Sequence, residues 1–131
     1  MGWGALGSNT TGGWNTAVGG QALSANTSGY SNTSVGLWSL VRNTTGSDNV
    51  VVGAQAMYNH TTGNQNVAMG DGVLYSDSTG ANNTAIGYRA MYGNKSGTDN
   101  TAIGIGKNKA ILVTNTTQCQ SIGGVIKIKR A

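Results

Sequence analysis

The feature that most constrains this chain is a repeat with a fixed period of 17 residues, which runs without insertion or deletion. Two columns of the repeat are invariant glycine, one at Gly12, Gly29, Gly46, Gly63, Gly80 and Gly97 and the other at Gly19, Gly36, Gly53, Gly70, Gly87 and Gly104. A unit this short cannot hold two packed helices, which need about 33 residues or more. The period therefore predicts one coil of a β-solenoid per unit.

Composition supports this interpretation. Glycine supplies 22 of 131 residues, proline and phenylalanine are absent, and charged residues make up 9%, against about 25% in ordinary globular domains. Strong helix formers are too scarce for a helical bundle, and a single cysteine, Cys119, excludes a disulfide scaffold. Glycine adopts positive φ freely and asparagine tolerates it, so their fixed columns predict the corners of the coils.

Each unit contains two short segments with strand-type residues, Asn15–Val18 and Gln21–Ser24 in the first full unit. We therefore predict an all-β fold, a β-solenoid (parallel β-roll or β-helix) of six to seven 17-residue coils over residues 1–106. Stacked coils place equivalent residues about 4.8 Å apart, so an asparagine column predicts a hydrogen-bonded ladder. That column consists of Asn15, Asn32, Asn49, Asn66, Asn83 and Asn100.

The expected core is thin. Only the Val18-type and Leu23-type positions offer large apolar side chains, and two such side chains contribute about 4–5 kcal/mol per coil. We therefore expect further burial against other copies, in a homotrimer. A column of small or apolar residues suits close approach around a symmetry axis. The candidates for the trimer axis are Ala17, Ser34, Val51, Ala68, Ala85 and Ala102.

Residues 107–131 depart from the repeat. They carry five basic residues and no acidic one, whereas residues 1–106 carry three basic and four acidic residues. The basic excess is therefore a property of the tail, and we expect no binding to nucleic acid. Ala110–Val113 and Val125–Ile128 are predicted strands and Gly123–Gly124 a predicted turn. We interpret 107–131 as a C-terminal β cap or a transition segment.

The residues that usually carry chemistry are sparse. His60 is the only histidine, and it occupies a column otherwise dominated by asparagine, where we interpret it as a substitution at a corner. The four aspartates are sporadic among the coils, so calcium sites of the β-roll type, which need a repeated acidic residue, are not expected. We predict no enzyme activity, no metal and no cofactor. The longest apolar runs, such as Ala110–Val113, are too short to cross a membrane, and no membrane insertion is expected.

One column suggests binding. Tyr58, Tyr75 and Tyr92 occupy successive equivalent positions and are expected to stack on one face, with Trp38 and Tyr88 as further surface aromatic residues. Aromatic faces beside amides suit a sugar or apolar ligand. The alternatives are a stacking ladder without a ligand and a contact between chains.

The segments Asn83–Tyr92 (NTAIGYRAMY) and Asn100–Gly104 (NTAIG) resemble repeats of phage tail fibres and of the heads of trimeric autotransporter adhesins. The tail-fibre repeats often lie upstream of an intramolecular chaperone. The resemblance implies a homotrimeric β-solenoid fibre that attaches to a host cell-surface glycan or protein, located in a virion or at the cell surface. Our first expectation is a structural and host-attachment segment of a viral tail fibre. The alternatives are a bacterial adhesin head or self-assembling extracellular filament subunit and, more remotely, an ice-binding solenoid.

Overall fold

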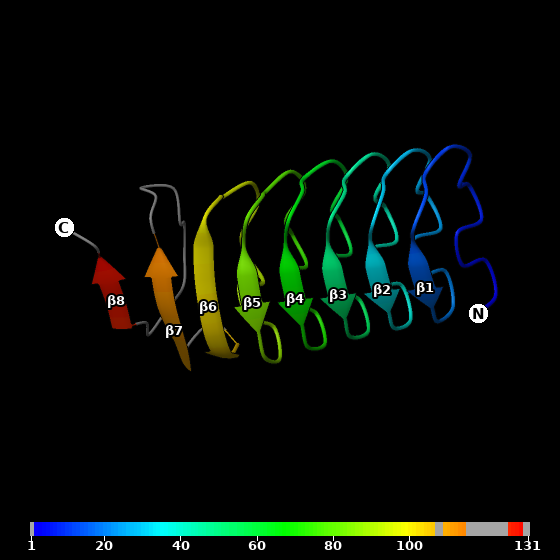
Figure 1. Cartoon of the computed structure of the whole chain (residues 1–131). Coiled ribbons are helices and arrows are strands. Elements are labelled where there is room, and N and C mark those ends of the chain that lie inside the picture. The colour runs from blue at the N-terminus through cyan, green and yellow to red at the C-terminus, as the bar shows by residue number, and fades with distance from the viewer. Residues whose placement is uncertain (1, 107–108, 115–125, 130–131) are drawn as a thin grey trace.

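The computed structural model describes residues 2–106, 109–114 and 126–129. Every regular element among them is a strand. The strands are β1 (Thr16–Val18), β2 (Thr33–Val35), β3 (Val50–Val52), β4 (Val67–Met69), β5 (Thr84–Ile86), β6 (Asn100–Ile105), β7 (Lys109–Thr114) and β8 (Ile126–Lys129). They stand side by side in chain order, and the rest of each coil passes behind them (Figure 1). Within the described residues, no helix is long and apolar enough to span a membrane.

The first six strands form a parallel sheet whose register equals the sequence repeat. Thr16 pairs with Thr33, and Thr33 pairs with Val50, so each step to the neighbouring strand is one 17-residue coil. The same register continues through β3, β4, β5 and β6. The chain is therefore an all-β solenoid of stacked coils, and the predicted fold class is confirmed.

The direction of the sheet changes after β6. Strand β7 pairs antiparallel to β6, with Asn100 opposite Thr114, and β8 pairs parallel to β7. The two strands predicted in the tail are present as β7 and β8, and they extend the sheet of the solenoid. The predicted turn at Gly123–Gly124 and the side chain of Cys119 lie outside the described residues.

The second segment of the coil, predicted as a strand over Gln21–Ser24, is a run of turns, so that prediction is wrong. The reason lies in the backbone: Gln21 and Leu23 have φ angles of 56° and 53°, and their equivalents in the other coils repeat this pattern. Residues with positive φ alternate here with residues that lack it, which is incompatible with an extended strand. The segment still bonds to its neighbours, for example through the Leu23 N–H to the Ser39 carbonyl at 3.2 Å. We call residues 20–25 and their equivalents the turn ribbon.

The left-handed conformation of Leu23 costs about 1–2 kcal/mol. It directs the side chain into the core, where Leu23, Leu40, Met57 and Leu74 are fully buried. Burial of a leucine side chain contributes about 1.5–3 kcal/mol. The local strain is thus offset by packing along the column.

The core lies between the strands and the turn ribbon, and it does not include the Val18 column. Val18 is 48% exposed, whereas Ala17 is 6% exposed. Side chains alternate along a strand, so Ala17 points inward and both Thr16 and Val18 point outward. The prediction that Val18-type residues fill the core is therefore wrong, because the central residue of each strand, such as Ala17 or Val51, occupies the inward-facing position.

Facing positions of the core compensate one another in size. The coil with Val51 on its strand has Ala56 on its turn ribbon, and the next coil reverses the pair with Ala68 and Val73. All four side chains are fully buried. In the coil of β2, both facing positions are serine, and the Ser34 hydroxyl donates to the Ser39 carbonyl at 2.9 Å. The size exchange is confined to the coils of β3 and β4, since the coils of β1 and β5 have alanine at both positions.

Candidate functional site

The column predicted to lie at a trimer axis faces the interior of its own chain. Its members are buried in the core that joins the strands to the turn ribbon. Side chains enclosed in this way cannot contact a second chain, so the assignment is wrong. The residues that belong to the interior of the chain and not to a trimer axis are Ala17, Ser34, Val51, Ala68, Ala85 and Ala102.

The flanking columns form the exposed surface of the sheet. Each short strand has a buried central residue between two residues that are at least partly exposed. We call this surface the outer sheet face. It consists of Thr16, Val18, Thr33, Val35, Val50, Val52, Val67, Met69, Thr84, Ile86, Thr101 and Ile103.

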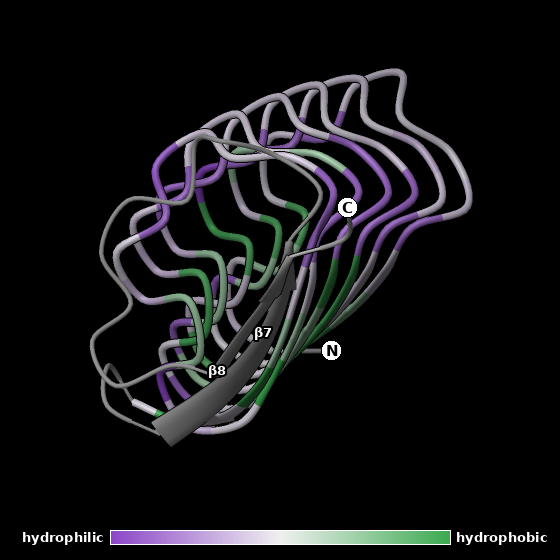
Figure 2. Cartoon of the chain, turned by 90° about the vertical axis from the view of Figure 1, so that its left-hand side faces the viewer, coloured by the Kyte–Doolittle hydropathy of each residue, from purple (hydrophilic) through white to green (hydrophobic). Residues whose placement is uncertain are grey.

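The outer sheet face contains no charged residue. Met69 and Ile103 are 43% and 51% exposed, and Val50 is 40% exposed. Six strands at a spacing of about 4.8 Å make it roughly 24 Å long. The hydropathy colouring shows the same kinds of residue recurring at the same place in successive coils (Figure 2). The other four residues of the face are threonine, and an uncharged, mainly apolar exposed surface of this kind is typical of an interaction site.

Exposed apolar residues continue just beyond the strands, past the Gly19-type corner. Leu37, Tyr88 and Ile105 occupy equivalent positions in different coils and are 49%, 48% and 66% exposed. Ile105 belongs to β6 and lies two residues after Ile103, so the two side chains point to the same side. The sequence signal for this surface is the alternation of small and larger residues around the Ala17 column. The small column faces inward and its larger neighbours face outward, which is the reverse of the prediction.

The predicted asparagine ladder is confirmed, and it lies inside the coils. Asn32 donates through Nδ2 to the Gly46 carbonyl at 2.8 Å, and its backbone N–H donates to Asn15 Oδ1 at 2.9 Å. Asn49 repeats the pattern one coil later, with Nδ2 donating to Asn32 Oδ1 at 3.0 Å and to the Gly63 carbonyl at 3.0 Å. The side chain thus closes each corner and joins adjacent coils.

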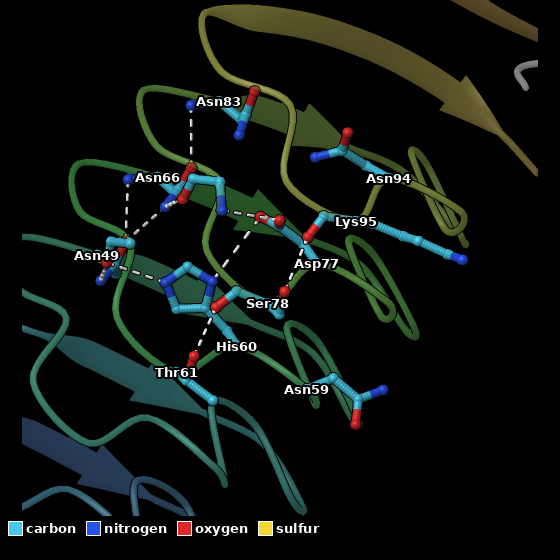
Figure 3. A network of polar contacts seen from close by, with 12 residues as sticks. Asn49, Asn59, His60, Thr61, Asn66, Asp77, Ser78, Asn83, Asn94 and Lys95 are labelled. Carbon is cyan, nitrogen blue, oxygen red and sulfur yellow. Dashed lines mark hydrogen bonds and ion pairs between the residues drawn. The ribbon is translucent and has the colours of Figure 1, made fainter. Parts of the chain in front are cut away.

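A second polar column consists of Asn9, Asn26, Asn43, His60, Asp77 and Asn94. All of them except the partly exposed Asn9 are buried. Asn43 donates to Asn26 Oδ1 at 2.8 Å and to the Gly46 carbonyl at 2.9 Å. His60 and Asp77 are fully buried members of this column, as Figure 3 shows. His60 thus takes the place of asparagine at a corner, with Nε2 2.9 Å from the Gly63 carbonyl, and its side chain lies in the interior.

The tyrosine column forms the predicted stack. The ring centroids of Tyr58 and Tyr75 are 5.2 Å apart with an interplanar angle of 10°, and those of Tyr75 and Tyr92 are 5.0 Å apart at 7°. The Arg89 guanidinium lies 5.3 Å from the Tyr92 ring and 5.1 Å from the Tyr88 ring. Because the stacked rings cover one another's faces, a ligand at this site would contact the edges of the rings.

The remaining aromatic candidate stands apart from this stack. Trp38 is 38% exposed and lies on the turn ribbon three coils before Arg89, at the equivalent position. Arg89 thus lies over the rings of both Tyr88 and Tyr92 and links Tyr88 to the tyrosine stack. Trp38 is separate from this group.

Threonine hydroxyls at one corner are already engaged within the solenoid. The Thr27 hydroxyl donates to the Thr44 carbonyl at 3.0 Å, and the Thr44 hydroxyl donates to the Thr61 carbonyl at 3.1 Å. This column therefore joins coils and does not present a free array of hydroxyls.

Within the described residues, no group of three or more histidine, cysteine or acidic side chains is arranged to hold a metal ion. Comparisons with models of protein families, with curated proteins and with solved structures found no match to this chain. The candidate sites therefore rest on the geometry alone: the outer sheet face, the tyrosine stack and the buried His60–Asp77 pair.

Proposed function

We propose that this chain is a structural and host-attachment segment of a fibrous homotrimer, most similar in role to the shaft of a viral tail fibre. The observation that carries the proposal is the outer sheet face, which is free of charge, at least partly exposed along the solenoid and apolar at eight of its twelve positions. Monomeric soluble proteins rarely leave a large contiguous apolar surface exposed. A second and a third copy of the chain would bury it.

The number of chains comes from the resemblance of Asn83–Tyr92 to repeats of trimeric fibres. The same resemblance supports the alternative of a bacterial adhesin head or extracellular filament subunit, which shares the shape and the mode of packing. Under either role, the edges of Tyr58, Tyr75 and Tyr92 lie away from the outer sheet face and remain candidates for contact with a host cell-surface glycan or protein.

The mass of the protein in solution tests the proposal. Sedimentation equilibrium at micromolar concentration is expected to give three times the mass of one chain. The double substitution Met69→Lys and Ile86→Lys places two buried ammonium groups in each interface, and we expect it to shift the mass to that of one chain without changing the far-ultraviolet circular dichroism spectrum.

The matched control is the substitution of Thr62→Lys and Thr79→Lys. These exposed positions have the same 17-residue spacing and receive the same charge, but they lie away from the outer sheet face. This variant is expected to keep the mass of the trimer. A wild-type protein that sediments as a single chain would overturn the proposal, and a mass of two chains would overturn the trimer.

A further inference from the structure

The second polar column is interrupted at its centre by two titratable side chains, His60 and Asp77. Among the described residues, they are the only titratable side chains in the core. They lie in adjacent coils, with His60 Nδ1 3.7 Å from Asp77 Oδ2 (Figure 3). Amides occupy the column on both sides of the pair.

Each of the two side chains has one polar atom that forms a hydrogen bond with the backbone of its own coil. His60 Nε2 lies 2.9 Å from the Gly63 carbonyl, and because a carbonyl only accepts, Nε2 carries a hydrogen. Asp77 Oδ1 accepts from the Gly80 N–H at 2.9 Å. His60 Nδ1 and Asp77 Oδ2 therefore face each other, and neither has another hydrogen-bond partner.

The neighbours of the pair do not supply the missing donor. Asn94 uses Nδ2 on the Gly97 carbonyl at 3.4 Å and accepts from the Gly97 N–H through Oδ1. On the other side, Asn43 presents a buried acceptor, Oδ1, that is also without a partner. The nearest charged side chain in the view of Figure 3, Lys95, extends away from the pair and is exposed.

Two unprotonated acceptors that face each other in a dry interior are unfavourable, because each has lost its hydrogen bonds to water. A single proton between them removes the conflict. Held on Nδ1, it gives a buried imidazolium–carboxylate contact; held on Oδ2, it gives a neutral carboxyl group that donates to the imidazole.

We propose that His60 and Asp77 form a buried proton-binding site that joins the coil of β3 to the coil of β4. The site is complete when it holds one proton between Nδ1 and Oδ2. A variant in which two acceptors face each other with no proton to share leaves both buried atoms without a hydrogen-bond partner, and it is therefore expected to lose stability.

The repeat itself provides the control. The double variant His60→Asn and Asp77→Asn restores the amides found elsewhere in the column, where asparagine donates to asparagine without any proton exchange. The single variant His60→Asn keeps the Asp77 carboxylate but removes the ring nitrogen that shares the proton, so an amide oxygen is expected to face Asp77 Oδ2.

The test is the urea midpoint of the wild type, His60→Asn and the double variant, measured at constant protein concentration. His60→Asn is expected to unfold at a urea concentration about 1 M lower than the wild type, and the added Asp77→Asn substitution is expected to restore the midpoint. A double variant that is no more stable than His60→Asn would overturn the proposal.

A measurement on the unmodified protein locates the proton directly. His60 is the only histidine of the chain, so its ring nitrogens give unambiguous ¹H–¹⁵N correlations. We expect Nδ1 to show the shift of a nitrogen that carries or accepts the shared proton. A shift of a free, unprotonated Nδ1 would exclude the site.

Discussion

Substitution of Gly53 by alanine is expected to prevent stable folding of the solenoid. Gly53 has a φ angle of +141°, and an added Cβ would lie 2.2 Å from the Gly70 carbonyl oxygen and 2.5 Å from its carbon. Both obstacles are backbone, so a side-chain rotation cannot relieve the overlap. The adjacent coil would have to move away, and the parallel ladder between β3 and β4 would break at that corner. We expect a loss of more than about 4 kcal/mol, measured by urea denaturation.

Gly93→Ala is the matched control for this prediction. A Cβ at Gly93 would meet no heavy atom within 4 Å, and this glycine does not have a positive φ. Its replacement is expected to change the free energy of unfolding by less than about 1 kcal/mol. If Gly53→Ala were as stable as Gly93→Ala, the close approach of the coils at their glycine corners would be refuted.

Substitution of Asn66 by leucine is expected to be the most destabilising change in the polar part of the core. Asn66 Nδ2 donates to Asn49 Oδ1 at 3.0 Å and to the Gly80 carbonyl at 2.9 Å, and Oδ1 accepts from the Asn83 N–H at 3.0 Å. Leucine would leave the Gly80 carbonyl and the Asn83 N–H without these partners in a closed interior. At about 1–3 kcal/mol for each orphaned group, the expected loss is about 3–5 kcal/mol.

The control for the ladder is Asn64→Leu, measured by the same urea denaturation. Asn64 is exposed, and its Oδ1 accepts one bond from the Ser47 N–H at 2.7 Å. Water can replace that bond, so we expect a loss below about 1 kcal/mol. Equal losses for the two variants would show that the internal amides do not hold the coils together.

The sequence was sufficient to predict the coil, because the parallel register and the glycine corners both follow from the period. It was not sufficient to decide which side of the strand is buried. Val18 is larger and more apolar than Ala17, and hydrophobicity alone places it inside. Which of the two residues is buried depends on which side of the strand faces the turn ribbon, and this is known only once the coil is packed.

The turn ribbon shows a second limit of the sequence. Gln21 and Leu23 carry no signal for positive φ, since neither glycine nor asparagine occupies these positions in that coil. Glycine appears there only at intervals, as at Gly72, whose φ angle is +60°. The ladder at Asn32 and Asn49 was predictable because its residue type is invariant. The His60–Asp77 pair was not, because burial of that column depends on how the corner folds inward.

The most direct test of the account is which surfaces of neighbouring chains lie closest together in the assembled protein. Spin labels at Thr84→Cys, on the outer sheet face, and at Thr79→Cys, on the exposed corner before it, can be compared by double electron–electron resonance in a Cys119→Ser background. Packing through the outer sheet face predicts a clear interchain distance at both sites, with the shorter distance at position 84. A shorter distance at position 79, or no interchain coupling at position 84, would contradict the account.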